Sequence, residues 1–289
     1  MNLSADLFID SKCTLAEGPI WHPERQELFW FDIHERTLFR ANAAGEILQK
    51  YLFEGKASAA AIIDRDNVMV ASVGALLRLD LVTGRTDYVL PLEPDKPGNR
   101  PNDSRVNPAG GFWIGTMADK EDGPKGSVYQ YRAGKLERLF GEITVTNSIC
   151  FSPDGATAYF SDTPTKKILK RAIDPATGGP KGDWSLFVDV EGHRGFPDGS
   201  VVDAEGFLWS ARWGGGCVVR HAPDGSIDRV IDLPTAKVTC PAFGGPELKT
   251  LYITTARNDD VTTDGPERGG GIFSIELDIA GQREPTLKL

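Results

Sequence analysis

SICFSPDGATAYFSDT, at residues 148–163, runs from an apolar stretch through a polar turn into a second stretch that carries aromatic residues. The Ser, Pro, Asp and Gly at its centre favour reversal of the chain, and the β-branched and aromatic residues on both sides favour strands. The segment therefore predicts a β-hairpin. The same pattern recurs in GPIWHPERQELFWFDI (18–33), AAIIDRDNVMVAS (60–72), DSRVNPAGGFWIGT (103–116), GSVVDAEGFLWSAR (199–212) and PAFGGPELKTLYITT (241–255).

These six segments follow one another at intervals of ~40–50 residues, which is the period of a four-stranded propeller blade. More polar hairpins lie between them, for example LDLVTGRTDYVL at 79–90, and we predict that these form the outer strands of the blades. No part of the sequence has a helical periodicity long enough for a substantial helix. The sequence thus predicts an all-β fold, a six-bladed β-propeller with a central tunnel, that occupies residues 1–289 as a single domain. Residues 1–12 are expected to add a strand to the last blade, because a ring must protect its final edge.

The composition is that of an ordinary globular protein, with 40% hydrophobic and 25% charged residues. The net charge of −9 argues against general binding of nucleic acid, whose phosphates attract clustered Lys and Arg. No apolar run approaches the ~18 residues of a membrane-spanning helix, and the first residues lack the features of a signal peptide. These observations predict a cytoplasmic protein that acts on a small molecule, without a membrane or nucleic-acid partner, and they leave the oligomeric state open.

The cysteines are scattered, with no CxxC pair and no nearby histidine at zinc spacing, so we expect buried, reduced thiols at Cys13, Cys150, Cys217 and Cys240. His22 occupies the turn position of its repeat and is expected to be structural, whereas the other histidines, His34, His193 and His221, are expected on the surface. A GxSxG nucleophile elbow, an HExxH motif and a P-loop are all missing from the sequence. A Ser-His-Asp hydrolase is therefore disfavoured.

One position just before each repeat holds a candidate site residue; across the six repeats it is Glu17, Ala59, Asn102, Asn147, Asp198 and Thr239. Equivalent positions of different blades are related by rotation about the axis, so Glu17, Asn102, Asn147 and Asp198 should meet in the tunnel. Carboxylate and amide oxygens in a dry tunnel need a cation between them, and they suit a hard divalent ion such as Ca²⁺, Mg²⁺ or Mn²⁺. Each residue taken singly is also an ordinary turn former. Their shared register is what favours a site.

An ordered set of motifs carries a resemblance to a known family: LAEGPIW (15–21), RPNDSRVNPAGGFWIGTM (100–117), TNSICFSPDG (146–155), FPDGSVVDAEGFLWSARWGGG (196–216) and GGPELKTLYITTA (244–256). The chain resembles the regucalcin, gluconolactonase and sugar-lactonase family over essentially its full length. The resemblance implies a six-bladed propeller with one divalent metal ion, whether Ca, Zn, Mn, Mg or Fe. It also implies the hydrolysis of sugar lactones, such as glucono-, xylono-, arabino- or galactonolactone, to aldonic acids.

The resemblance also implies roles for single residues. Glu17, Asn147 and Asp198 match the family's metal ligands, and Asp198 matches the residue proposed as general base. Arg100 and Asn102 match the substrate-binding pair. The Gly that often follows the liganding Asn is replaced here by Ser148, which is expected to be harmless.

A second departure concerns the loop after GTMA, DKEDGPKG at 119–126. Lys120 stands where some animal members have an acidic substrate-binding residue, and we count Lys120 and its neighbour Glu121 among the candidates for substrate binding. The loop itself is either a lid or a solvated turn. Phe196 and Trp213 are candidates for the tunnel mouth.

Two other functions remain open at this point. The first is a paraoxonase-like esterase or organophosphate hydrolase on the same metal, although such sites generally use a histidine-containing pocket and a second calcium. The second is a propeller that binds calcium without catalysis. The pairing of Arg100 with Asn102 beside the metal position favours an enzyme.

Overall fold

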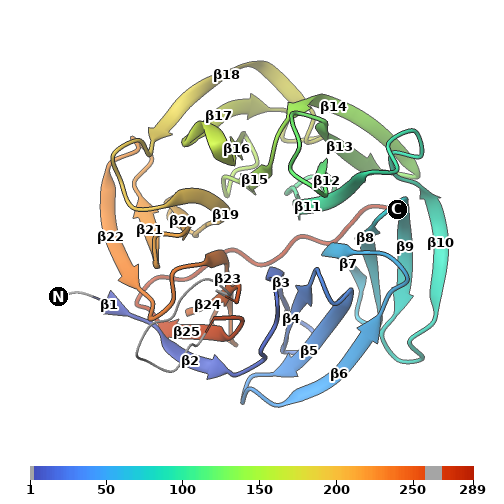
Figure 1. Cartoon of the computed structure of the whole chain (residues 1–289), viewed down its shortest axis with the longest axis horizontal. Helices are drawn as coiled ribbons and strands as arrows, with labels where there is room; N and C mark the ends of the chain where they lie inside the picture. The colour runs from blue at the N-terminus through green and yellow to red at the C-terminus, as the bar shows by residue number, and fades with distance from the viewer. Residues whose placement is uncertain (1–2, 258–268) are drawn as a thin grey trace.

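The computed structural model describes residues 3–257 and 269–289, which form six β-sheets arranged in a ring (Figure 1). The one helical element of these residues is a short 3₁₀ turn at Thr163–Thr165. The predicted six-bladed β-propeller is therefore confirmed, as is the expected lack of substantial helices. Nowhere in the described chain is there a helix with the length and apolar character needed to cross a membrane.

Each of the first four blades consists of four consecutive antiparallel strands, with the first strand nearest the axis. In chain order these are β3 (Ala16–His22), β4 (Glu27–Asp32), β5 (Thr37–Asn42) and β6 (Ile47–Leu52); β7 (Ala57–Asp64), β8 (Asn67–Ser72), β9 (Ala75–Asp80) and β10 (Thr86–Pro91); β11 (Asn99–Val106), β12 (Phe112–Ala118), β13 (Gly126–Arg132) and β14 (Lys135–Ile143); and β15 (Thr146–Phe151), β16 (Thr157–Asp162), β17 (Lys167–Ile173) and β18 (Pro180–Asp189). All residues of β11 and β12 are buried, whereas β6 and β10 are mostly exposed. The polar hairpins between the repeats thus form the outer strands, as predicted.

The last two blades each include a strand from the N-terminal end of the chain. The fifth blade contains β19 (Phe196–Val202), β20 (Leu208–Trp213), β21 (Cys217–His221) and β22 (Ile227–Asp232), and β1 (Leu3–Ser4) pairs in parallel with β22. The sixth contains β23 (Val238–Gly244), β24 (Thr250–Thr255), β25 (Ile272–Glu276) and, antiparallel to β25, β2 (Asp6–Ile9). The expected closing strand is therefore confirmed in β2, while the pairing of β1 with the fifth blade was not predicted. Residues 1 and 2 of the predicted segment lie outside the described residues.

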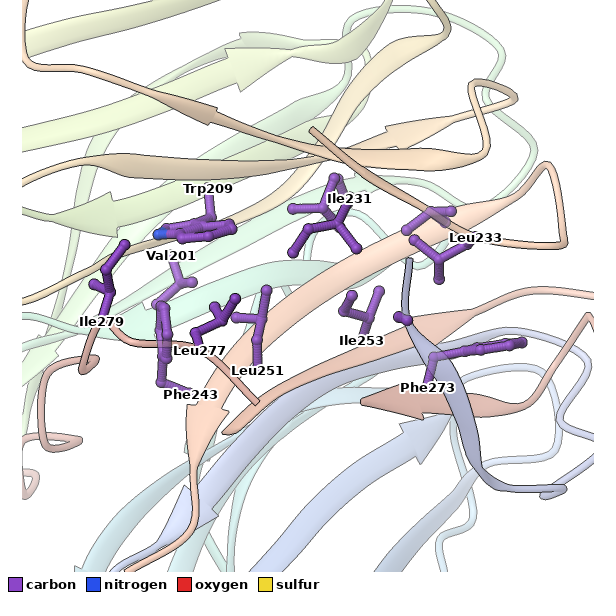
Figure 2. Packing of buried hydrophobic residues seen from close by; sticks show 14 residues of the cluster. Val201, Trp209, Ile231, Leu233, Phe243, Leu251, Ile253, Phe273, Leu277 and Ile279 are labelled. Carbon is purple, nitrogen blue, oxygen red and sulfur yellow. The ribbon is translucent and has the colours of Figure 1, made fainter. Parts of the chain in front are cut away.

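The hydrophobic core consists of apolar layers between adjacent blades. Figure 2 shows the layer between the fifth and sixth blades, where Trp209 packs against Phe243 with their rings nearly perpendicular at a centroid distance of 5.7 Å. Ile231, Leu251 and Phe273 are fully buried in the same layer. Because each blade buries both faces of its inner strands against its neighbours, the inner strands are held in fixed positions around the axis.

The segment that follows β25, residues 277–289, is named here the C-terminal strap. It leaves the sixth blade and crosses the middle of the ring in the view of Figure 1. Its backbone and side chains contact four further blades, through Ala204 N to Ala280 O (3.0 Å), Gln282 Nε2 to Val202 O (2.9 Å) and Phe151 O (3.1 Å), Lys288 N to Gly110 O (2.9 Å) and Leu287 N to Ile62 O (2.7 Å). Glu284 of the strap also pairs with the buried Arg105 of β11. These contacts lie near the C-terminal ends of the inner strands, so the strap covers one end of the ring.

The cysteines match the prediction, because all four are buried and free. His22 is buried and its Nε2 lies 3.2 Å from Asp64 O, in agreement with a structural role, and His34 and His193 are exposed as expected. The expectation for His221 was wrong, since this side chain is only 1% exposed. Its Nε2 accepts a hydrogen bond from Arg212 Nη2 (2.7 Å) and its Nδ1 donates to Gly225 O (3.1 Å), so an internal arginine satisfies it.

Burial, and secondarily the positive charge of Arg212, lowers the pKa of His221 to about 4. The unfolded chain binds a proton at this histidine near pH 6.5, while the folded chain does not bind it until about pH 4. The free energy of unfolding should therefore fall by up to about 3 kcal/mol between pH 7 and pH 4. Below pH 4 this histidine should cause no further change, because both the folded and the unfolded chain then bind the proton. Urea unfolding at a series of pH values checks this.

The control compares wild type with His221→Gln and with His193→Gln, which alters an exposed histidine. We expect the difference in unfolding free energy between wild type and His221→Gln to shrink as the pH falls, and that for His193→Gln to stay nearly constant. A difference for His221→Gln that is independent of pH would contradict the assignment.

Candidate functional site

A β-bulge lies at the same place in all six described blades, where the innermost strand pairs with the second strand. The register shifts occur between Glu17 and Ile20, Ala57 and Ala59, Pro101 and Ser104, Asn147 and Cys150, Pro197 and Ser200, and Val238 and Cys240. Each position singled out by the sequence repeat falls at or inside one of these shifts. Because a bulge turns a side chain away from the regular alternation of a strand, it gives a physical cause for the convergence at the axis.

A cavity of about 270 Å³ collects almost all the predicted site residues. Its polar lining comes from four blades and comprises Glu17, Arg100, Asn102, Glu121, Asn147, Thr163 and Asp198. Phe196 and Trp213 supply part of its apolar wall. A volume of this size suits a small ligand.

Lys120 is the predicted residue that the structure separates from this group. It lines a different cavity, of about 740 Å³, together with Lys56, Lys96 and Asp119. Within the loop 119–126, Glu121 therefore faces the site cavity and Lys120 faces the neighbouring one.

Hydrogen bonds connect the substrate-binding candidates to the metal-ligand candidates. Arg100 Nη1 donates to Asn102 Oδ1 (2.7 Å), and Asn102 Nδ2 donates to Thr146 O (2.8 Å) and, more weakly, to Asn147 Oδ1 (3.3 Å). Asn147 Nδ2 in turn donates to Thr163 Oγ1 (2.8 Å). This arrangement fixes the orientation of the Asn147 amide and leaves its oxygen, with one long hydrogen bond, as the atom that can bind a cation.

The two carboxylates of the site are deeply buried. Glu17 Oε2 accepts a hydrogen bond from Gly18 N (2.9 Å), and Asp198 Oδ1 accepts one from Gly199 N (3.1 Å). Burial and the charge of Asp103 raise the pKa of Glu17 to about 8. Burial and then the charge of Glu17 raise the pKa of Asp198 well above its usual range, and the nearby Arg100 offsets only part of either effect.

Two buried carboxylates that repel one another must either keep a proton or hold a cation. With the Asn147 amide oxygen they form an all-oxygen donor set, which suits hard divalent ions. The residues present therefore fit the metal ion that the sequence resemblance implies. No group of three or more His, Cys, Asp or Glu that could hold a metal occurs in residues 3–257 and 269–289, so the donor set depends on an amide.

Three residues of the site were missed by the sequence reasoning. Thr163, at the end of the hairpin in the fourth blade, accepts from Asn147 and donates through Oγ1 to Pro197 O (2.9 Å). Asp119 lies 3.2 Å from Arg100 Nε and 2.6 Å from Lys56 Nζ. Asp103 accepts a hydrogen bond from Ile149 N (2.7 Å), and burial raises its pKa to about 6.

The positions of Asp103 and Asp119 carried a signal, because one directly follows Asn102 and the other directly follows GTMA. Thr163 carried none, since its role depends on the approach of the fifth blade to the end of the fourth.

The site cavity and the C-terminal strap lie at opposite ends of the same inner strands. Arg100, Asn147 and Asp198 are near the first residues of β11, β15 and β19, whereas the strap contacts Phe151 and Val202, the last residues of β15 and β19. The strap therefore covers one end of the ring, and the polar side chains of the site lie near the opposite end.

Comparisons with known proteins found a matching family and several similar chains. The family described as the SMP-30/Gluconolactonase/LRE-like region matches residues 15–257. A solved structure of regucalcin from Agrobacterium tumefaciens strain C58, described as a calcium-binding protein, is similar with a TM-score of 0.95 and 38% identity, over 100% of this chain and 99% of that chain. L-arabinolactonase of Azospirillum brasilense is 34% identical over 285 residues, which cover 96% of this chain and 93% of that protein. Pentonolactonase XacC of Haloferax volcanii is 33% identical over 291 residues, which cover 96% and 95%.

Proposed function

Because the chain belongs to the SMP-30/gluconolactonase/LRE-like family, we propose that it is a divalent-metal-dependent hydrolase that opens sugar lactones to aldonic acids. The observation that carries the proposal is the convergence of Glu17, Asn147 and Asp198 on one small cavity that also contains Arg100 and Asn102. Relatives named as lactonases for several different sugars support the substrate class.

The proposed ligands are Glu17, Asn147 and Asp198, and the cation that they hold would supply Lewis-acid polarisation of the lactone carbonyl. Asp198 is also the proposed general base. Its Oδ1 is engaged by Gly199 N, and its Oδ2 accepts no hydrogen bond from the described protein, which leaves Oδ2 to take a proton from the attacking water. Burial, and then the charge of Glu17, raise the pKa of this carboxylate in the metal-free protein, and a bound cation would lower it, so that Asp198 would be ionised and able to accept the proton.

Arg100 is the proposed anchor for the sugar. Its Nη1 is occupied by Asn102 Oδ1 and Pro101 O, while its Nη2 donates to no described oxygen and remains available for a substrate hydroxyl or ring ester. Asp119 and Asn102 hold the guanidinium in place from two sides, so the substrate meets a donor that is already oriented.

Metal removal tests this function. We expect a chelator to reduce acid release from glucono-, xylono-, arabino- and galactonolactone to the spontaneous rate, and one of Ca²⁺, Mg²⁺, Mn²⁺, Zn²⁺ or Fe²⁺ to restore it. Acid release is followed by titration at constant pH, with elemental analysis to verify that the metal has been removed. Full activity in verified metal-free protein would contradict the proposal.

The same assay separates the alternatives. Hydrolysis of aryl esters in preference to the sugar lactones would favour the paraoxonase-like function. Tight binding of a metal without turnover of any lactone would favour a calcium-binding role, the property that the description of the regucalcin structure names.

A further inference from the structure

A second cavity, of about 430 Å³, lies between the fourth and fifth blades and shares no lining residue with the site cavity. Its walls come from β18, β20, β21 and β22 and from the segments that join β18 to β19 and β21 to β22. Much of the wall is apolar, with Phe187, Val219, Ile227 and Val230. A cavity of this size, with an apolar wall and several polar and charged side chains, has the character of a small-molecule site.

Arg212 of β20 lines this cavity and is only 2% exposed. Its Nη2 donates to His221 Nε2 (2.7 Å), and its Nη1 is buried without a hydrogen-bond partner. Because His221 Nδ1 donates to Gly225 O, the imidazole is neutral and acts as the acceptor that orients the guanidinium.

Arg212 differs from the other deeply buried arginines of the described chain in having no acidic partner. Arg105 pairs with Glu284, Arg220 pairs with three acids including Asp203, and Arg100 lies beside Asp119. No ion pair joins Arg212 to any carboxylate within residues 3–257 and 269–289. A buried charge without a counter-ion is costly, so an anion in this cavity would relieve that cost.

We propose that this cavity is a binding site for a small organic carboxylate, whose carboxylate group pairs with Arg212 and whose apolar part packs against Phe187, Val219 and Ile227. The planar guanidinium fork matches a carboxylate. Asp189 and Asp224 at the cavity disfavour a phosphate dianion, and the apolar wall disfavours a bare inorganic anion. The proposal is independent of the function proposed for the site at the axis.

The experiment is a calorimetric titration of the full chain with benzoate, and separately with benzamide and inorganic phosphate. Benzoate should bind saturably to one site, at least about tenfold more tightly than benzamide, which has the same ring without the charge. Arg212→Met should weaken benzoate binding at least about tenfold. Arg194→Met is the matched control, because Arg194 lines the same cavity but is exposed and already paired with Asp232, and its effect should stay below about threefold.

A second variant makes the test independent of any effect of Arg212 on folding. Ile227 is 49% exposed at the cavity, so Ile227→Trp should obstruct the site and also weaken benzoate binding, whereas Val82→Trp, at a 71% exposed position outside the cavity, should not. Absence of saturable benzoate binding, or binding that survives both Arg212→Met and Ile227→Trp, would overturn the proposal. Tighter binding of phosphate would overturn the assignment to a carboxylate. Loss of benzoate binding in Asp198→Asn would also overturn it, by placing the anion at the axis.

Discussion

Asp198→Asn is expected to lower kcat/KM for sugar lactones by about 10³-fold or more. The substitution keeps the size of the side chain but removes both the charged oxygen proposed as a metal ligand and the group proposed as general base, and general base catalysis alone contributes about 10²–10⁴-fold. Acid release at saturating metal, corrected for the spontaneous rate, measures the effect. Asp87→Asn, at an exposed aspartate of β10, is the matched control and should keep full activity.

Stability should respond to Asp198→Asn in the opposite sense to activity. In metal-free protein Asp198 and Glu17 repel each other in a buried site, so removal of one charge should leave the free energy of unfolding unchanged or raise it. Urea unfolding in the presence of chelator checks this. Wild-type activity in Asp198→Asn would refute the assignments of Asp198 as general base and as metal ligand. A large loss of stability would instead show that any loss of activity results from misfolding.

Glu284→Gln is expected to lower the free energy of unfolding by about 3–5 kcal/mol. Arg105 and Glu284 are both largely buried and form an ion pair between the third blade and the C-terminal strap. Removal of the Glu284 charge leaves Arg105 buried without its ion-pair partner, with, among the described residues, only the more distant charge of Asp103 nearby, and the loss of one partner of a buried pair has a large effect. Chemical denaturation of wild type and variant measures the difference.

The matched control is Glu205→Gln. Glu205 also pairs with a buried arginine, Arg220, but it is 58% exposed and Arg220 keeps Asp203 and Asp228. Its effect should be at most about 1 kcal/mol. An effect of Glu284→Gln that is also no larger than about 1 kcal/mol would show that the strap adds little stability through this pair.

The fold was predictable because each blade repeats the same local sequence pattern, in which turn-forming residues lie at the same position between two strands. The site was predictable in part for the same reason, since a repeat with rotational symmetry brings one position of every blade to the axis. Segments outside the repeated pattern were not predicted from the sequence. The C-terminal strap and β1 lack the hairpin pattern, and their contacts come from backbone groups and from single side chains such as Gln282.

The placements of single residues that the sequence did not predict have a common physical cause. His221 is polar and lies in an outer hairpin, but an internal arginine satisfies its ring, and only the packing of neighbouring strands reveals that partner. Lys120 and Glu121 are adjacent in sequence yet face different cavities, because consecutive residues of a loop point in different directions. The metal and substrate assignments themselves remain predictions, and the experiments above decide them.

The pairing of β2 with β25 sets an order for biosynthesis. β2 leaves the ribosome long before its partner β25, and the strap follows later still. Until β25 has been synthesised, the nascent protein exposes strand edges at both ends of an incomplete ring, and such edges promote aggregation. Contacts between residues so distant in sequence also form slowly. The ring therefore cannot close before β25 has left the ribosome, and β2 remains an unpaired strand during that interval.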